Sequence, residues 1–139
     1  MTDVFTKTKR SELMSRIKNR NTRPEMTVRS MLHRMGYRFR LHRADLPGKP
    51  DIVLPRYKTV IFVHGCFWHR HKDCRFAYTP KSRTDFWLKK LESNAIRDQQ
   101  VKTDLERLGW RVITVWECEL REPIQLGSRL DVTLKQKKE

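Results

Sequence analysis

The chain has 139 residues, of which 31 are lysine or arginine and 16 are aspartate or glutamate, so its formal net charge is +15 at pH 7. This length suits one domain with a single core. The charge favours a polyanionic partner, nucleic acid first, because solubility alone needs a much smaller imbalance. An anionic membrane surface is the weaker alternative, since no basic amphipathic helix or lipidation site is evident. Without a bilayer-spanning apolar run or an apolar N-terminal signal, we expect a cytoplasmic protein.

The first part of the chain predicts a basic arm followed by a helix. Residues 1–21 are polar and basic and show no sustained hydrophobic period, which is typical of a mobile arm. Thr22 and Glu25 have capping-box spacing, and Pro24 suits a first helical turn. Gly36 is expected to end this helix. Its apolar residues recur at helical intervals: Val28, Met31, Leu32 and Met35.

Three strands are expected next. Residues 37–42 alternate apolar and basic side chains, the period of a half-buried strand. Two apolar runs, 51–54 and 57–64, follow the turn LPGKP, and the short break at Pro55 and Arg56 predicts that they pair as antiparallel neighbours. One of these strands therefore starts on Asp51, and the next ends on His64.

The remaining pattern predicts a long helix and a last strand. A broken apolar stripe runs over residues 84–108 and ends at Gly109, and residues 110–116 read as a strand. The whole order of elements predicts an α/β fold with a mixed central sheet flanked by helices, in one domain over residues 22–139.

Two of the chain's three cysteines lie within a histidine-rich segment, HGCFWHRHKDC, at residues 64–74. Cys66, His71 and Cys74 form C-x4-H-x2-C, and Cys118 follows the last expected strand. A Cys3His set suits zinc, and a closed shell of four protein ligands makes the ion structural. The alternative is that Cys118 is a small buried residue and the other two cysteines are incidental.

Two further histidines and several acids predict chemistry beside this zinc site. His64 and His69 are not needed as zinc ligands and, with an unperturbed pKa of about 6.5, suit proton transfer. Asp51, at a strand end, can hold Mg²⁺ with a backbone carbonyl and phosphate oxygens, although a turn-capping role is equally typical of such an aspartate. Glu25 is a candidate second acid. Asp98 could orient a histidine, but the sequence alone favours an exposed helical residue.

Together these segments resemble the very short patch repair (Vsr) DNA mismatch endonucleases of bacteria. The resemblance is carried by PGKPDIV, VIFVHGCFWHRH, TDFW, NAIRD and GWRVITVWEC, in the same order and at similar spacing, and it covers nearly the whole chain to about Leu120. It implies a restriction-endonuclease-like core and an enzyme that nicks one strand 5′ of the thymine in a T·G mismatch left by deamination of 5-methylcytosine.

The resemblance also implies roles for individual residues. Asp51 and the backbone carbonyl of Val63 would hold Mg²⁺, and His69, backed by Asp98, would act as acid or base. Glu25 and His64 match further active-site positions. The structural zinc would be held by Cys66, His71, Cys74 and Cys118.

Aromatic and basic residues are expected to contact the DNA. By resemblance, Phe67, Trp68 and Trp87 are pushed into the duplex beside the mismatch, and a rigid aromatic pair on a basic surface can wedge between base steps. Core packing is an equal alternative for Trp87. The basic arm would add phosphate contacts. The predicted contacts outside the aromatic group are Met14, Arg16 and Lys49.

Two features depart from common patterns. The D/E-x-K triplet of restriction-type nucleases is missing, since Phe62, Val63 and His64 occupy its expected place. Lys72 and Asp73 also separate His71 from Cys74, a spacing that can differ by one residue within the family.

Two other functions fit the same residues. One is a restriction-type endonuclease without mismatch preference, and the other is a non-catalytic, zinc-stabilised DNA-binding protein. We expect a monomer that binds double-stranded DNA with a T·G mismatch, with mismatch-repair proteins as further partners.

Overall fold

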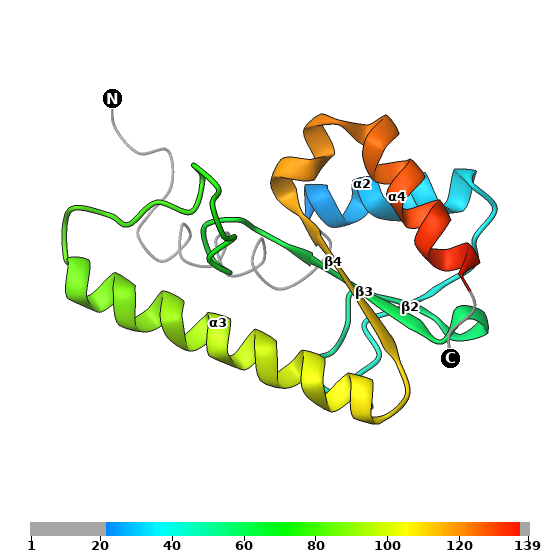
Figure 1. Cartoon of the computed structure of the whole chain (residues 1–139), viewed down its shortest axis with the longest axis horizontal. Helices are drawn as coiled ribbons and strands as arrows, with labels where there is room; N and C mark the ends of the chain where they lie inside the picture. The colour runs from blue at the N-terminus through cyan, green and yellow to red at the C-terminus, as the bar shows by residue number, and fades with distance from the viewer. Residues whose placement is uncertain (1–21, 137–139) are drawn as a thin grey trace, which may run out of the picture.

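The computed structural model describes residues 22–136, which form a four-stranded sheet with helices on both faces (Figure 1). Short 3-10 turns at Pro55–Tyr57 (η1) and Glu117–Arg121 (η2) follow two of the strands. The helices and strands, in chain order, are α2 (Arg23–Arg34), β1 (Arg40–Leu41), β2 (Ile52–Leu54), β3 (Thr59–His64), α3 (Thr84–Arg107), β4 (Arg111–Trp116) and α4 (Pro123–Lys135).

The sheet is mixed, as the order of elements predicts. The strands lie in the order β1-β2-β3-β4, with β1, β2 and β3 antiparallel and β3 and β4 parallel. In the parallel pair, Thr59 is opposite Arg111 and His64 is opposite Trp116. Because β3 and β4 run in the same direction, the residues that follow both strands emerge at one edge of the sheet. The antiparallel β2 begins at that same edge.

Helices α2 and α4 cover one face of the sheet (Figure 1). Thr22 caps α2 by accepting a hydrogen bond from the N–H of Glu25 at 3.3 Å, which fixes where the helix begins. The Tyr37 hydroxyl donates to Asp131 of α4 at 2.6 Å and ties the two helical segments together. The buried apolar residues of this face are Val28, Met31, Leu32, Tyr37, Ile52, Leu54, Ile61, Ile113, Val115, Leu126, Leu130 and Leu134.

Helix α3 covers the opposite face with only part of its length. Leu105, with Val101 beside it, packs against Val53, Val60 and other residues of the sheet. The N-terminal part of the helix extends beyond the sheet, alongside the loop that follows β3 (Figure 1). No helix in residues 22–136 is both long and apolar enough to cross a membrane.

Three expectations from the sequence need correction. The first strand, expected over 37–42, is limited to Arg40–Leu41, because Tyr37 is buried among the helices of the first face. The strand expected from residue 57 begins at Thr59, since Pro55–Tyr57 forms a 3-10 turn. Helix α4 was not predicted, although Leu126, Leu130 and Leu134 recur every four residues.

Candidate active site and metal centre

Asp51 lies at the sheet edge where β3 ends. Its Oδ2 accepts a hydrogen bond from the N–H of Val63 at 2.8 Å, where the antiparallel pairing of β2 and β3 predicts contact. Burial raises the pKa of Asp51 to about 7; the neighbouring Glu25 adds to the rise, while the Val63 N–H and Arg29 oppose it. A half-buried carboxyl group with this pKa readily loses its proton when a divalent cation binds, and its hard oxygens suit Mg²⁺.

Glu25 lies next to Asp51 and is almost fully buried, with 2% of its surface exposed. Each of its carboxylate oxygens has a basic partner. Oε1 is 2.9 Å from the His42 Nε2, and Oε2 accepts from the Arg29 guanidinium one helical turn away. Ligand atoms of Glu25, His42 and Asp51 lie within 4.8 Å of one another. Arg29 and His42 could not be predicted as site residues, because neither lies in a recognisable motif.

His69 and Asp98 form a second group at this edge. The His69 Nδ1 is 2.6 Å from the Asp98 Oδ2, although 29 residues separate the two in sequence. Asp98 lies on α3, and the loop is held beside the helix by the Asn94 amide, which donates to the Trp68 carbonyl at 3.1 Å. The contact leaves Nε2 of His69 as the nitrogen that can exchange a proton with a substrate.

His64 forms the wall behind His69. The two imidazole rings are stacked, with centroids 3.8 Å apart and an interplanar angle of 6°. Burial and the neighbouring His69 lower the pKa of His64 to about 4, with Asp98 opposing the shift. His64 is therefore neutral at physiological pH, so it can pack against His69 without charge repulsion.

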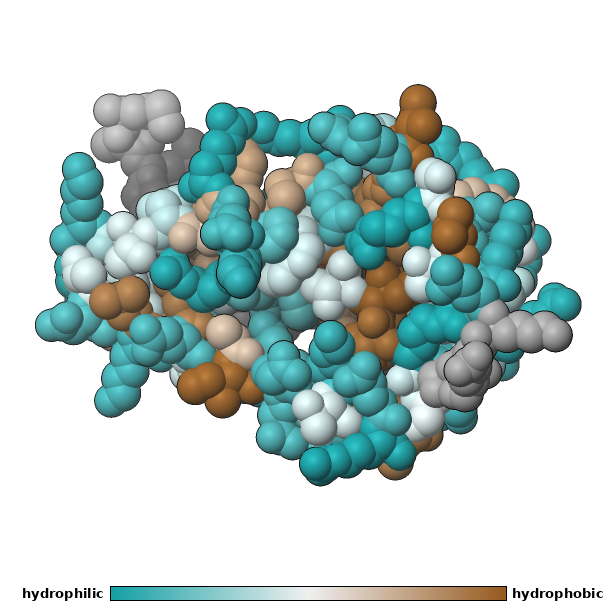
Figure 2. All heavy atoms as spheres, viewed as in Figure 1, coloured by the Kyte–Doolittle hydropathy of each residue, from teal (hydrophilic) through white to brown (hydrophobic). Residues whose placement is uncertain are grey.

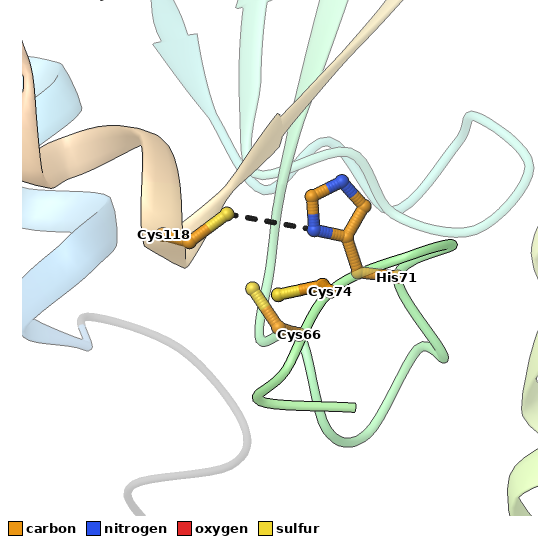
Figure 3. A group of neighbouring side chains, drawn as sticks. All are labelled: Cys66, His71, Cys74 and Cys118. Atoms are coloured by element: carbon orange, nitrogen blue, oxygen red, sulfur yellow. Dashed lines mark hydrogen bonds between the residues drawn. The ribbon is translucent and has the colours of Figure 1, made fainter. Parts of the chain in front are cut away.

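The four predicted zinc ligands converge at the end of the parallel strand pair (Figure 3). Cys66 and Cys118 each lie two residues past the paired residues His64 and Trp116, so the strand register brings them together. His71 and Cys74 come from the loop after β3. All four ligand atoms lie within 4.8 Å of one another.

The geometry and chemistry of this cluster suit zinc. Cys118 Sγ and His71 Nδ1 are 3.5 Å apart. Tetrahedral bonds to zinc would place sulfur and nitrogen about 3.6 Å apart. Burial raises the pKa of the Cys66 thiol to about 12, so a bound cation is needed to keep it a thiolate at neutral pH. The His71 ring also stacks on Trp116 at 4.2 Å, which fixes its orientation.

The three predicted DNA-contacting aromatic residues form one cluster. Ring centroids of Phe67 and Trp68 are 5.1 Å apart, and Trp87 lies 5.7 Å from Phe67 and 5.9 Å from Trp68. Trp87 belongs to neither of the two core clusters found in residues 22–136. Tyr78 and Phe86 extend the group and are 61% and 46% exposed. Neither was among the predicted contacts: Tyr78 lies outside the recognised segments, and in TDFW only Trp87 was assigned to DNA binding.

One cleft is lined by residues that belong to, or contact, three of these groups. Val63, Trp68, His69 and Asp98 line it together with Lys90, Arg97 and others. On the face seen in Figure 2, hydrophilic residues cover most of the surface and apolar residues are confined to small patches. Lysine and arginine beside a row of aromatic rings are typical of a surface that binds nucleic acid.

The other predicted contacts lie apart from this cleft or outside the described residues. Lys49 is exposed in the turn that leads into Asp51, with a left-handed φ of 47°. Met14 and Arg16, and the whole arm of residues 1–21, lie outside the described residues.

Comparison with known proteins identifies the family. The family model for the DNA mismatch endonuclease Vsr matches residues 2–75. The type II nicking enzyme V.XorIIP of Xanthomonas oryzae pv. oryzae is 54% identical over 130 residues, which cover 94% of this chain and 95% of that protein.

Two other relatives are similar over most of their length. The type II nicking enzyme V.NmeAIP of Neisseria meningitidis is 49% identical over 131 residues, covering 94% of this chain and 93% of that protein. The DNA mismatch endonuclease Vsr of Escherichia coli is 47% identical over 121 residues, covering 87% and 77%. The chain therefore belongs to the Vsr family of DNA mismatch endonucleases and is a DNA endonuclease with a restriction-endonuclease-like α/β core.

Proposed function

We propose that this enzyme nicks one DNA strand 5′ of the thymine in a T·G mismatch, in a reaction that depends on Mg²⁺ and repairs deaminated 5-methylcytosine. The observation that carries the proposal is the cleft lined by the His69–Asp98 pair, Trp68 and Val63. Val63 is the hydrogen-bond partner of Asp51. Acid–base, cation-binding and base-stacking groups are thus within reach of one phosphodiester. The relatives include a mismatch endonuclease and nicking enzymes, which supports single-strand cleavage at a mismatch.

The Asp51 carboxylate and the backbone carbonyl of Val63 are the proposed Mg²⁺ ligands. When bound, the cation would neutralise charge that develops on the phosphate. His69 exchanges a proton at Nε2, while Asp98 holds the ring by its Nδ1. Glu25 and His64 play supporting roles, Glu25 beside the cation ligand and His64 behind the His69 ring.

The aromatic cluster is the proposed means of finding the mismatch. Phe67, Trp68 and Trp87 would insert between base steps, and unstacking costs least where pairing is already defective. Lys49 and the arm, including Met14 and Arg16, would add contacts to the DNA. The zinc, held by the Cys3His set, would keep the loop between Cys66 and Cys74 in the shape that presents Phe67 and Trp68.

A nicking assay tests this function directly. Matched and T·G duplexes of varied flanking sequence, labelled on either strand, are incubated with and without Mg²⁺. We expect a nick on the thymine strand of the mismatch alone, and only with Mg²⁺. Equal cleavage of matched duplex would favour a restriction-type endonuclease, and tight binding with no nick would favour a DNA-binding protein.

The biological setting follows from the same reaction. An enzyme that acts on mismatched chromosomal DNA would work in the bacterial cytoplasm, as a monomer, beside mismatch-repair proteins. Sedimentation of the protein with and without duplex would test the monomer, with a dimer as the contrary result.

A further inference from the structure

We infer that Arg29 and His42 are positioning residues that hold Glu25 away from the catalytic cation, so that Asp51 is the one acidic side chain that binds it. This inference rests on the proposed function, since it concerns the cation at Asp51. It assigns a role to two residues that neither the family motifs nor the predicted site included.

The contacts of Glu25 are the first observation. A buried carboxylate beside Asp51 would ordinarily be a natural second ligand for a divalent cation. Here Oε2 accepts from the Arg29 guanidinium and Oε1 lies 2.9 Å from the His42 Nε2. These contacts occupy one position on each carboxylate oxygen and fix its orientation, so turning Glu25 towards a cation would weaken charged contacts inside a protein interior, where their loss is costly.

The placement of His42 is the second, independent observation. This residue has a left-handed φ of 46°, which is uncommon for residues other than glycine, although histidine is among those that adopt it most often. Its backbone N–H donates to the Asp51 carbonyl at 3.4 Å while its ring reaches Glu25. The strained turn therefore connects the backbone of one acid to the side chain of the other, and local strain of this kind is typical of functional sites.

Arg29 supplies the positive charge that this arrangement needs. Its side chain is 13% exposed and comes from α2, one turn after Glu25. The Arg29 Nη2 also lies 3.5 Å from the His42 Nε2, so the three residues form one network. The chain has no lysine at the place of the D/E-x-K triplet, and Arg29 is a basic group set among the acids instead.

The test is Mn²⁺ binding to zinc-loaded protein without DNA. Electron paramagnetic resonance of the free ion measures the binding. Mn²⁺ prefers the same oxygen ligands as Mg²⁺. In Arg29→Met, Oε2 of Glu25 loses its charged partner and becomes available to the cation while His42 still contacts Oε1, so Mn²⁺ affinity should rise about tenfold. Arg29→Lys, the matched control, keeps the charge and should stay within about twofold of the wild type. Thermal unfolding and zinc content verify that each variant is folded.

The Glu25→Gln background separates the positioning role from a simple effect of charge. Combined with Glu25→Gln, the Arg29→Met change should alter Mn²⁺ affinity by no more than about threefold, because no carboxylate remains to be released. An equal rise in both backgrounds would overturn the inference, as would no rise in folded Arg29→Met. Should Arg29→Met fail to fold, His42→Asn tolerates the left-handed backbone, is too short to reach Glu25, and should raise the affinity about threefold.

Two single variants distinguish failure of the inference from failure of the proposed function. Glu25→Gln alone should leave Mn²⁺ affinity within about threefold, whereas Asp51→Asn should abolish binding. Binding lost equally in both variants would make Glu25 a ligand and overturn the inference alone. Binding that survives Asp51→Asn would overturn the cation site itself and, with it, both proposals.

Discussion

The Cys3His cluster and the Asp51 site lie at the same edge of one sheet, yet they are built in opposite ways. The cluster takes its four ligands from two loops that emerge from parallel strands, and their donor atoms are already close enough to bind an ion. At Asp51 a single acid is held by the N–H of Val63, and its acidic neighbour Glu25 is engaged by Arg29 and His42.

Under the proposed assignments, in which the cluster holds zinc and Asp51 helps to hold Mg²⁺, the difference separates structural from chemical metal binding. Soft donors in a complete shell leave no position for substrate, so the ion they hold stabilises a loop. Hard donors in an incomplete shell leave positions for water and phosphate. The ring of His71 packs on Trp116, and Trp116 in turn contacts His64 edge to face at 5.4 Å. Ring contacts through Trp116 therefore connect the Cys3His cluster to His64, and the two sites share no ligand.

Asp51→Asn should disrupt the proposed Mg²⁺ site at Asp51, the open site, and leave the Cys3His cluster, the closed site, intact. The asparagine oxygen can still accept the Val63 N–H, but the charged cation ligand is gone, so we expect nicking of a T·G duplex to fall by about 10³-fold or more. Zinc content should match that of the wild type. Single-turnover nicking and metal analysis measure both, with Glu106→Gln, an exposed acid on α3, as the control. Nicking within tenfold of the wild type would contradict the assignment of Asp51.

Cys118→Ser should break the closed site and, through it, the open one. Loss of one thiolate should lower zinc affinity by at least about 100-fold and lower the melting temperature, because the loop after β3 has few buried apolar residues of its own. Competition with a coloured chelator measures the affinity. Ser128→Ala, at an exposed position of α4, is the control for a small polar change. Stoichiometric zinc and full activity in Cys118→Ser would show that this cysteine is not a ligand.

Asp98→Asn should slow the chemical step while leaving both proposed metal sites intact, which sharpens the comparison. The amide can still contact His69 but no longer favours the correct ring orientation by its charge, so we expect kcat to fall about 10- to 100-fold. KM for DNA and zinc content should be unchanged. Asp104→Asn, on the same helix and bonded to Gln100, is the matched control. A higher KM with an unchanged kcat would make Asp98 a binding residue instead.

The positions of candidate site residues are easiest to predict from sequence where regular structure determines them. Antiparallel pairing of β2 and β3 brings Asp51 to Val63, and parallel pairing of β3 and β4 brings Cys66 towards Cys118. The antiparallel pair was predicted from two apolar runs with a short break, whereas Cys66 and Cys118 were grouped by their ligand chemistry and the parallel pairing is a finding of the structure. The mixed sheet itself was predicted from the order of elements.

Contacts between distant or irregular segments were beyond the same reasoning. The Asp98 contact with His69 depends on how far α3 extends past the sheet, which periodicity does not encode. His42 reaches Glu25 from a left-handed backbone position, which the apolar and polar pattern of residues 37–42 does not predict. Helix α4 is a different case, since the leucine stripe was present and was overlooked beside the lysine-rich tail.

The smallest expected effect is on the free energy of unfolding, and its pH dependence comes from Asp51. The pKa of Asp51 is raised from its ordinary 3.8 to about 7, so the stability that its protonated form contributes is complete below about pH 4 and is lost as pH rises through 7. Asp51→Asn has no such titration. Without added Mg²⁺, the variant should therefore be more stable than the wild type at pH 8 by about 1–3 kcal/mol and similar to it near pH 4. Urea unfolding of zinc-loaded protein at both pH values measures the difference. A difference that does not change with pH would mean that Asp51 is ionised without a free-energy cost in the folded protein. A cation would then gain nothing by relieving that cost.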